Sequence, residues 1–357
     1  MKEIFKKDWE LTQERLIAWW KGEDLVACVM APRDKPAIAA PAPAQPATPE
    51  EKWLDTAYRA ADAEHTFSKT LFAGEAFPYF DPSIGPGNLA TMLGSKPGYE
   101  FNTVWFEPCI NDPDAHPPLV FDPEHEGVQA QMAVIEAGLE KADERFLVGM
   151  PDLIENIDIL ASLRGTECFL LDLVERPGFV KEKVFEINRV FFEAFDRIYQ
   201  RIKDEKNGNV SASFRIWGPG KTSKVQCDTA AMISPDMFAE FVVPALTEQC
   251  EWLDYSLFHL DGTQCIVQLD HLLAIEALDA VQWIPQSGRP QGGDPCWHAM
   301  YRKILKAGKS VQAVGVRPDE VIPLLDAVGP EGMYIMVGAR SEAEAYDILK
   351  KIEPYRA

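Results

Sequence analysis

Residues 309–338 read KSVQAVGVRPDEVIPLLDAVGPEGMYIMVG and contain two short apolar runs on either side of a longer segment. We expect strands at KSVQAVG and MYIMVG, because short apolar runs bounded by glycine are typical of buried strands. The stretch between them, Pro318 to Val328, is long enough for a helix and has the apolar spacing of one. A strand, a helix and a second strand in this order indicate a parallel βαβ unit.

The same alternation extends from this unit in both directions. Further strands are expected at RFLVG (145–149), VSASFRIWG (210–218), DYSLFHL (254–260) and AVQWIP (280–285). Further helices are expected at 125–142, in segments up to Arg201 that break near 176–178, and at 235–253, 266–278, 296–307 and 342–352. With strands at Leu25–Met30 and near Phe77–Phe80, the total is about eight, the number that closes a (β/α)8 barrel.

We therefore predict an α/β fold, a (β/α)8 TIM barrel with irregular N-terminal insertions. An open doubly wound sheet is the alternative, but no glycine-rich nucleotide-binding turn follows any strand. We expect residues 1–357 to form a single domain. Its residues 1–76 would supply N-terminal helices (8–21 and 49–67) and the Pro/Ala-rich loop 31–49, and residues 77–357 would form the main barrel. The segment 77–123 is rich in Pro, Gly and Asn, so we expect an irregular excursion there.

Charge and composition exclude several classes of function. The formal net charge of −21 would repel a phosphate backbone, which makes nucleic acid an unfavourable partner. No apolar stretch reaches the length of a membrane span and the N-terminus has no apolar signal core, so we expect a cytoplasmic protein. The 7 cysteines contain no CxxC pair and form an odd set, which is typical of reduced thiols.

The strand-like stretch SLFHLDG, residues 256–262, is the first candidate for chemistry. Alternation along a strand puts His259 and Asp261 on the same side, and Gly262 lets the chain turn close to whatever they hold. Catalytic side chains of barrel enzymes come from this end of the strands. The pair could bind a metal, hold a substrate or move a proton. The structural alternative is a hydrogen-bonded histidine and an aspartate that caps the next helix.

Two other strand ends carry candidate ligands. In GKTSKVQCD, Cys227 is the cysteine best placed to be a thiolate ligand, and Asp228 is an acid/base candidate that could instead begin the following helical region. In GMPDLIEN, Asp152 is well placed as a helix cap, whereas Glu155 is less easily explained in that way.

The loops offer candidate substrate-binding groups. These are aromatic, acidic or anion-binding side chains in the irregular excursion or after expected strands, namely Tyr79, Asp81, Trp105, Trp217 and Arg289. The aromatic members suggest a flat or apolar ligand. They could equally bury the interface of a homodimer.

Several motifs resemble the uroporphyrinogen decarboxylase superfamily and its relatives, the cobalamin-associated methyltransferases. They are QCDTAAMISPDMFAEFVVPALTEQ (226–249) with the following H-x-D-G strand and AVQWIPQSGRP, GMPDLIENIDILASLRG (149–165) with LLDLVERPGFV, GKSVQAVGV, and YIMVGARSEAEA. The resemblance covers most of the chain from about Phe77 onward. It implies a (β/α)8 barrel with its site in the barrel mouth.

The sequence departs from both branches of that family. The decarboxylases carry an arginine-rich N-terminal motif, of which only Arg33 is present here. The branch that methylates coenzyme M holds zinc by H-x-C and a later cysteine. Here His259 matches, Asp261 replaces the first cysteine, and Val337 and Ala339 stand in the last strand region without a thiol. A histidine and carboxylate set makes a harder, more Lewis-acidic site, suited to an ether or alcohol oxygen.

We therefore predict a methyltransferase that moves a methyl group from a small O- or N-methylated substrate to a corrinoid. Zinc would be held by His259 and Asp261, with Glu155 or Cys227 as further ligands. Because DAHPPL (114–119) lacks the glycine of a corrinoid-binding motif, the cobalamin would arrive on a partner protein. One alternative is metal-free decarboxylation of a small carboxylate, with Arg33, Arg215 or Arg289 holding the anion and Asp81 or Asp228 as acid/base. Another is a non-catalytic binding protein.

Overall fold

A mostly parallel sheet of seven strands forms the centre of the computed structural model, which describes residues 2–356. Its strand order is β2-β1-β13-β12-β11-β10-β9, and every neighbouring pair except β1 and β2 is parallel. The strands are β1 (Val26–Pro32), β2 (Thr70–Gly74), β9 (Thr222–Gln226), β10 (Tyr255–Asp261), β11 (Ala280–Ile284), β12 (Ser310–Val316) and β13 (Met333–Gly338). The fold is therefore a mixed α/β fold.

Three pairs of short strands lie outside this sheet. They are the parallel pair β3 (Tyr79–Phe80) and β6 (Leu147–Val148), and the antiparallel pairs β4 (Lys96–Tyr99) with β5 (Val104–Glu107) and β7 (Gly208–Ser211) with β8 (Ile216–Pro219). A parallel bridge joins Met150 to Ser211, next to β6 and β7. Among the described residues, these backbone hydrogen bonds do not join the sheets into one closed ring.

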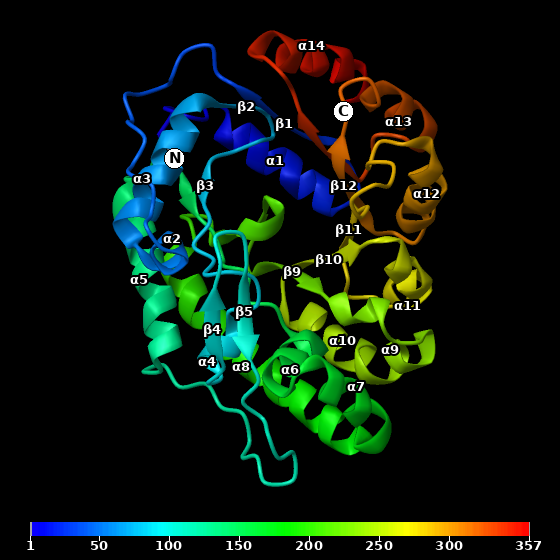
Figure 1. Ribbon diagram of the computed structural model, residues 1–357. Helices are drawn as coiled ribbons and strands as arrows, with labels where there is room; N and C mark the ends of the chain where they lie inside the picture. The colour runs from blue at the N-terminus through cyan, green and yellow to red at the C-terminus, as the bar shows by residue number, and fades with distance from the viewer. Residues whose placement is uncertain (1, 357) are drawn as a thin grey trace.

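Helices surround the strands. In Figure 1, α9 to α14 follow one another around one side of the molecule, α3 and α5 cover the other side, and α6 to α8 lie at the bottom. The helices are α1 (Trp9–Trp20), α2 (Pro49–Leu54), α3 (Thr56–Lys69), α4 (Leu89–Met92), α5 (Glu126–Ala142), α6 (Asn156–Arg164), α7 (Thr166–Glu175), α8 (Pro177–Ile202), α9 (Pro235–Phe241), α10 (Val243–Trp252), α11 (Leu269–Leu273), α12 (His298–Lys306), α13 (Val321–Val328) and α14 (Glu342–Ile352).

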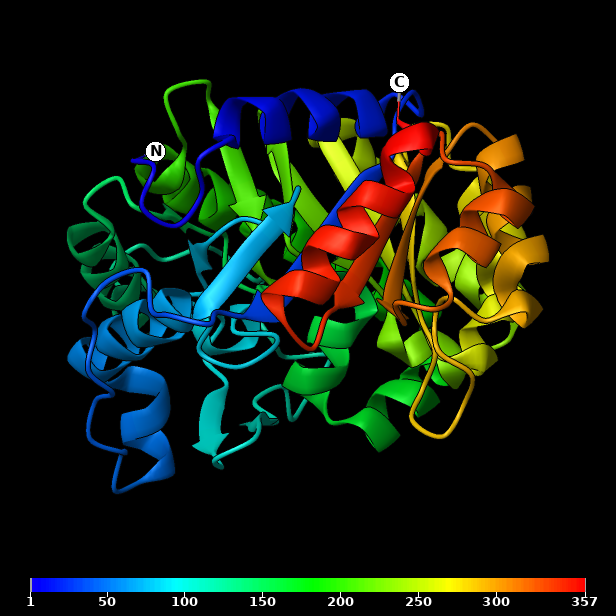
Figure 2. The same cartoon turned by 90° about the horizontal axis from the view of Figure 1, so that it is seen from above.

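Helix α1 lies across the end of the sheet at which the parallel strands begin. Trp19 Nε1 donates to the Gly332 carbonyl (3.0 Å), just before β13, and its own carbonyl accepts from the Ser310 hydroxyl (2.5 Å), the first residue of β12. In Figure 2, α1 runs along the top and the parallel strands point away from it. The opposite end, where these strands finish, is therefore the end at which side chains of several strands can share a site.

The alternation predicted from the sequence is present, but several elements differ. The strand expected at 210–218 is a hairpin, β7 and β8, joined by the 3-10 helix η1 (Ala212–Phe214), and the next strand, β9, was not predicted. The helix expected at 266–278 is instead the 3-10 helix η3 (Thr263–Gln268) followed by the short α11, and the helix expected at 235–253 divides at Val242.

The N-terminal part also differs in detail. The helix expected at 49–67 is divided into α2 and α3, and β2 follows α3 as an antiparallel edge strand that the sequence did not predict. Residues 33–48 contain no helix or strand, as their proline content predicts. Within residues 2–356, no helix combines the length and apolar character needed to cross a bilayer.

Candidate active site

A row of polar side chains crosses the sheet at one level. The strand register aligns Gln226 of β9 with His259 of β10, His259 with Gln282 of β11, Gln282 with Gln312 of β12, and Gln312 with Tyr334 of β13. Residues at the same level of neighbouring parallel strands point to the same face of the sheet. The row therefore builds a polar layer inside an otherwise apolar core.

Hydrogen bonds along this row orient His259. The Oε1 atom of Gln282 lies 2.5 Å from Nδ1 of His259, and the Gln282 amide donates in turn to Gln312. Gln312 is itself fixed, because its Nε2 donates to the Phe214 carbonyl at 2.8 Å. A carbonyl oxygen can only accept, so Nδ1 of His259 carries the proton and Nε2 keeps its lone pair. Burial lowers the pKa of His259, which favours this neutral form.

His259 shares its end of the sheet with two carboxylates. Asp228, His259 and Asp261 each offer one potential metal-ligand atom, and these three atoms lie within 4.8 Å of one another. His259 is half-buried and both carboxylates are exposed. The 3-10 helix that follows β10 has Gly262 as its N-cap and no side-chain cap. The structure therefore gives Asp261 no capping role, and its carboxylate is available for a ligand.

Asp228 is held in place by neighbours from two elements. Its Oδ2 accepts from Gln226 Nε2 at 2.9 Å, and its backbone N–H donates to Asp158 of α6 at 2.7 Å. Asp158 also accepts from the Thr229 hydroxyl at 2.6 Å, which fixes the first turn after β9. Desolvation and the nearby Asp158 carboxylate raise the pKa of Asp228.

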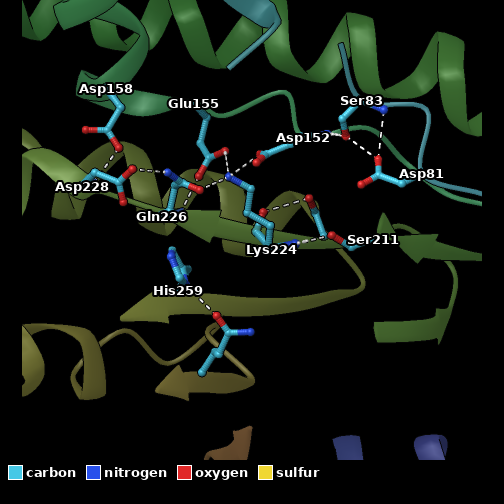
Figure 3. Close-up of polar contacts among 12 residues, drawn as sticks. Asp81, Ser83, Asp152, Glu155, Asp158, Ser211, Lys224, Gln226, Asp228 and His259 are labelled. Atoms are coloured by element: carbon cyan, nitrogen blue, oxygen red, sulfur yellow. Dashed lines mark hydrogen bonds and ion pairs between the residues drawn. The ribbon is translucent and has the colours of Figure 1, made fainter. Parts of the chain in front are cut away.

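A buried ion pair lies next to Gln226, between His259 and the Asp152–Glu155 segment, as Figure 3 shows. Lys224 Nζ lies 2.8 Å from Asp152 and 3.9 Å from Glu155, and both Lys224 and Glu155 are almost fully shielded from solvent. Glu155 Oε1 also accepts from the Gln226 N–H at 2.5 Å. Burial raises the pKa of Glu155 to about 7, whereas the two carboxylates outweigh burial and raise the pKa of Lys224. Asp152, expected as a helix cap, is instead a partner of this lysine.

The chain around Glu155 has an unusual backbone conformation. Ile154 and Asn156, which flank it, have φ values of 53° and 62°, in the left-handed region that residues other than glycine rarely adopt. Such conformations persist only where the surrounding structure enforces them, and they concentrate at functional sites. Here the conformation turns the Glu155 carboxylate inward toward Lys224 and β9.

The other candidate metal ligand, Cys227, is buried and is not a member of the three-residue group. Burial, followed by the Asp158 carboxylate, raises its pKa well above the usual value, so the thiol form is favoured over the thiolate. Glu155 likewise lies outside the group, because its carboxylate faces Lys224 and the Gln226 amide. The residue that joins His259 and Asp261 is Asp228, predicted from the sequence as an acid/base.

Two cavities are lined by predicted residues, and the first of them adjoins the group. A cavity of about 490 Å³ is lined by Asp228, Asp158 and the predicted Trp105, which is about half exposed on β5. A second cavity, of about 530 Å³, is lined by Tyr79 and Asp81. The Asp81 carboxylate accepts from the Ser83 N–H (2.9 Å) and hydroxyl (2.5 Å). Three of the five predicted substrate-binding residues therefore line cavities.

The other two predicted substrate-binding residues, Trp217 and Arg289, line neither of these cavities. Trp217 is fully buried beneath α1, where its ring meets Trp9 at 5.7 Å and its Nε1 donates to Asp204 at 2.9 Å. This position is at the α1 end of the sheet, opposite His259. Arg289 is exposed in the loop after β11.

Sequence reasoning did not select Asp158, Gln282 or Gln312. Gln282 and Gln312 are each completely buried in the middle of an apolar strand, in the runs AVQWI and SVQAV. A glutamine at the same place in two successive apolar strands is the signal that could have identified them, since buried polar groups need partners. Asp158 lies inside an apolar helix and gave no such signal.

Comparison with known proteins gives a structural likeness. No protein-family model matches the sequence, and no curated protein sequence matches it either. A solved structure described as a methyltransferase from Methanosarcina mazei superposes with a TM-score of 0.61 at 12% sequence identity. The match covers 95% of this chain and 97% of that chain. At this identity the likeness shows a shared fold that spans the whole molecule.

Proposed function

We propose that this protein is a metal-dependent methyltransferase, which takes a methyl group from a small O- or N-methylated substrate and transfers it to a corrinoid on a partner protein. The observation that carries the proposal is the convergence of Asp228, His259 and Asp261 at one end of the strands. The match to a structure described as a methyltransferase, over nearly the full length of both chains, supports it. We further propose that the seven-stranded sheet and the smaller pairs form an interrupted (β/α)8 barrel whose mouth contains the site.

The donor set fits zinc. One imidazole and two carboxylates are ligand types that zinc accepts, and a catalytic site uses three protein ligands and leaves one position open. The hydrogen bond from Nδ1 of His259 to Gln282 is the outer contact that metal-ligating histidines usually make, and it leaves Nε2 free to bind. When bound, the metal would act as a Lewis acid that polarises the heteroatom carrying the methyl group.

The protein's own residues would position and neutralise the reacting groups. Gln226 and Asp158 fix Asp228, and the glutamine row fixes His259, so two of the three ligands are oriented before anything binds. The buried Lys224 acts electrostatically on Asp228 and offsets part of the negative charge of the site. Glu155 is fully buried against Lys224 and the Gln226 N–H, so its part would be to position Lys224 and β9.

The decisive experiment is metal analysis of the folded protein. We expect close to one zinc per chain in the wild type, measured by elemental mass spectrometry after purification without chelators, and little in His259→Ala, Asp261→Asn and Asp228→Asn. Cys227→Ser is the matched control, because we expect its metal content to be unchanged. A metal-free wild type, or zinc loss in Cys227→Ser alone, would contradict the proposed site.

Activity then tests the reaction. The zinc-loaded protein is mixed with cob(I)alamin and a panel of O-methyl and N-methyl compounds, and formation of methylcobalamin is followed by absorbance. We expect turnover with at least one donor and none with Asp261→Asn. Carbon dioxide release from a carboxylate without any corrinoid would favour the decarboxylase alternative instead.

A further inference from the structure

Six of the fifteen residues that line the cavity of about 530 Å³ are aromatic. It lies between α2, α3, β2 and β3, and its aromatic lining residues are Trp53, Tyr58, Phe67, Phe72, Tyr79 and Phe80. We call it the aromatic cavity. Its volume is in the range of small-molecule sites, which are mainly apolar with a few polar groups that fix the ligand's orientation. The polar groups present therefore indicate what kind of ligand fits.

Arg215 is the polar group that stands out in this cavity. Its guanidinium lies over the Tyr79 ring, 5.7 Å from the ring centroid, and its Nη1 donates to the Met30 thioether at 3.0 Å. Sulfur is a weak acceptor, and among residues 2–356 no carboxylate forms an ion pair with Arg215. An arginine has five N–H donors in a planar fork, so most of its hydrogen-bonding capacity is available to a ligand.

The backbone presents Arg215 to the cavity in a fixed way. Its φ of 56° lies in the left-handed region, and the Tyr334 hydroxyl donates to its carbonyl at 2.7 Å. Tyr79 lines the same cavity, and its hydroxyl forms no hydrogen bond with any of the described residues. Arg215, with most of its donors unused, and the Tyr79 hydroxyl together suit an oxyanion.

The charged side chains that line the aromatic cavity also favour an anionic ligand. The whole chain carries a net charge of −21, yet the cavity is lined by the cations Lys52, Arg59 and Arg215 and by only two carboxylates, Asp62 and Asp81. One oxygen of Asp81 is already bound by the Ser83 N–H and hydroxyl. Arg59 uses its guanidinium on the backbone carbonyls of Trp53, Asp81 and Pro82, so it contributes mainly charge. Lys52 donates to the Phe101 carbonyl, so Arg215 is the cation with the most donors left for a ligand.

One short segment connects the cavity to the candidate active site. Phe214 packs its ring against His259, with the centroids 4.5 Å apart, while the next residue, Arg215, lines the cavity. Gln312 holds the Phe214 carbonyl and also belongs to the hydrogen-bonded row that orients His259. An anion bound by Arg215 would thus have a defined place relative to the histidine.

We propose that the aromatic cavity binds the carboxylate end of the substrate through Arg215, with the aromatic wall holding a flat apolar body. The inference that this ligand is the substrate rests on the proposed function, but the binding itself does not. The substrate class is then a methylated compound that also carries a carboxylate, such as a methoxylated aromatic acid.

Calorimetric titration tests the binding without any turnover. The probes are 4-methoxybenzoate and its neutral counterpart of similar size, 4-methoxybenzyl alcohol, each titrated into zinc-loaded and metal-stripped protein. We expect the carboxylate to bind more tightly than the alcohol in both. In Arg215→Gln its affinity should fall by about tenfold or more, because hydrogen bonds to a charged group are lost, while binding of the alcohol should not change.

Three further variants separate this role from a structural one. Arg215→Lys keeps the charge and should retain part of the preference for the carboxylate, and Tyr79→Phe should weaken carboxylate binding to a smaller extent. Arg189→Gln, an exposed position on α8, should have no effect. Near-ultraviolet circular dichroism checks that each variant is folded.

Equal affinity for the two probes, an unchanged carboxylate affinity in Arg215→Gln, or no binding of the carboxylate would overturn the proposal. If the carboxylate binds as expected but the protein holds no zinc and forms no methylcobalamin, the binding site stands and the proposed function fails. If zinc and methyl transfer are found but Arg215→Gln has no effect on carboxylate binding, the proposed function stands and the proposed binding site fails.

Discussion

At the scale of single residues, the candidate site depends on side chains that are not themselves proposed metal ligands. Gln282 accepts from Nδ1 of His259 and is itself held by Gln312, so the tautomer and the ring plane of the histidine are set by two glutamines in neighbouring strands. Both glutamines are fully buried. A buried polar group without a partner is costly, which keeps this row in one arrangement.

Replacing Gln282 by alanine should therefore weaken metal binding without removing a ligand. We expect an affinity loss of about 10- to 100-fold, the range seen when the outer partner of a metal-bound histidine is removed. Competition with a chromophoric chelator measures the affinity. Gln129→Ala, an exposed glutamine at the start of α5, is the control. An unchanged affinity in Gln282→Ala would show that the row does not orient His259.

At the scale of the elements, β9 is a buried strand that its polar composition makes difficult to predict from the sequence. Its sequence, TSKVQ, alternates Thr222, Lys224 and Gln226 with Ser223 and Val225, so it has few of the apolar residues that mark a buried strand. All five residues are nevertheless buried. Lys224 and Gln226 are polar because they face the buried network with Asp152, Glu155 and Asp228. The strand was missed because its interior face serves the site instead of an apolar core.

Helix α14 gives a prediction at this scale. Its N-cap is Ser341, whose hydroxyl accepts from the Glu344 N–H at 3.2 Å, and its buried face includes Ala345 and Ile348. Ser341→Ala should lower the free energy of unfolding by about 1 kcal/mol, because an N–H at the helix start loses its partner. Urea denaturation measures the change. Ser341→Asn, which keeps a capping side chain, should stay within a few tenths of the wild type, and equal losses in both variants would contradict a capping role.

At the scale of the whole molecule, one buried carboxylate ties distant parts of the chain together. Glu75, which is 1% exposed, accepts from Arg15 of α1 (2.7 Å), from Arg356 near the C-terminus (2.8 Å) and from the Ala27 N–H of β1 (2.7 Å). The two ends of the chain thus meet at the same sheet edge. This junction lies on the side of the sheet where α1 crosses the strand starts, away from the candidate site.

Glu75→Gln should destabilise the fold without changing zinc content. We expect a loss of about 2 to 4 kcal/mol in the free energy of unfolding, since two largely buried guanidinium groups lose their counter-charge. Urea denaturation gives the stability, and elemental analysis gives the metal content. Glu182→Gln, an exposed position on α8, is the control and should change the stability by less than about 0.5 kcal/mol. A loss of that small size in Glu75→Gln would mean that the junction does not stabilise the fold.

The sequence by itself determined the alternation of strands and helices, and the sharing of one strand face by His259 and Asp261. Both follow from local periodicity, because a strand repeats every two residues and a helix about every 3.6. The α/β class was predictable for the same reason. The length of each element was less predictable, since Val242 divides one predicted helix and 3-10 turns replace much of another.

Only the tertiary structure decided which side chains meet. Asp228 joins His259 and Asp261 because β9 and β10 pair in a register that no local pattern fixes, and Glu155 reaches Gln226 across 71 positions of the chain. The aromatic cavity likewise combines α2, α3 and β3 with Arg215, more than 100 positions further along the chain. Sequence periodicity describes neighbours within one element, whereas a site requires contacts between elements, and these depend on packing and strand register.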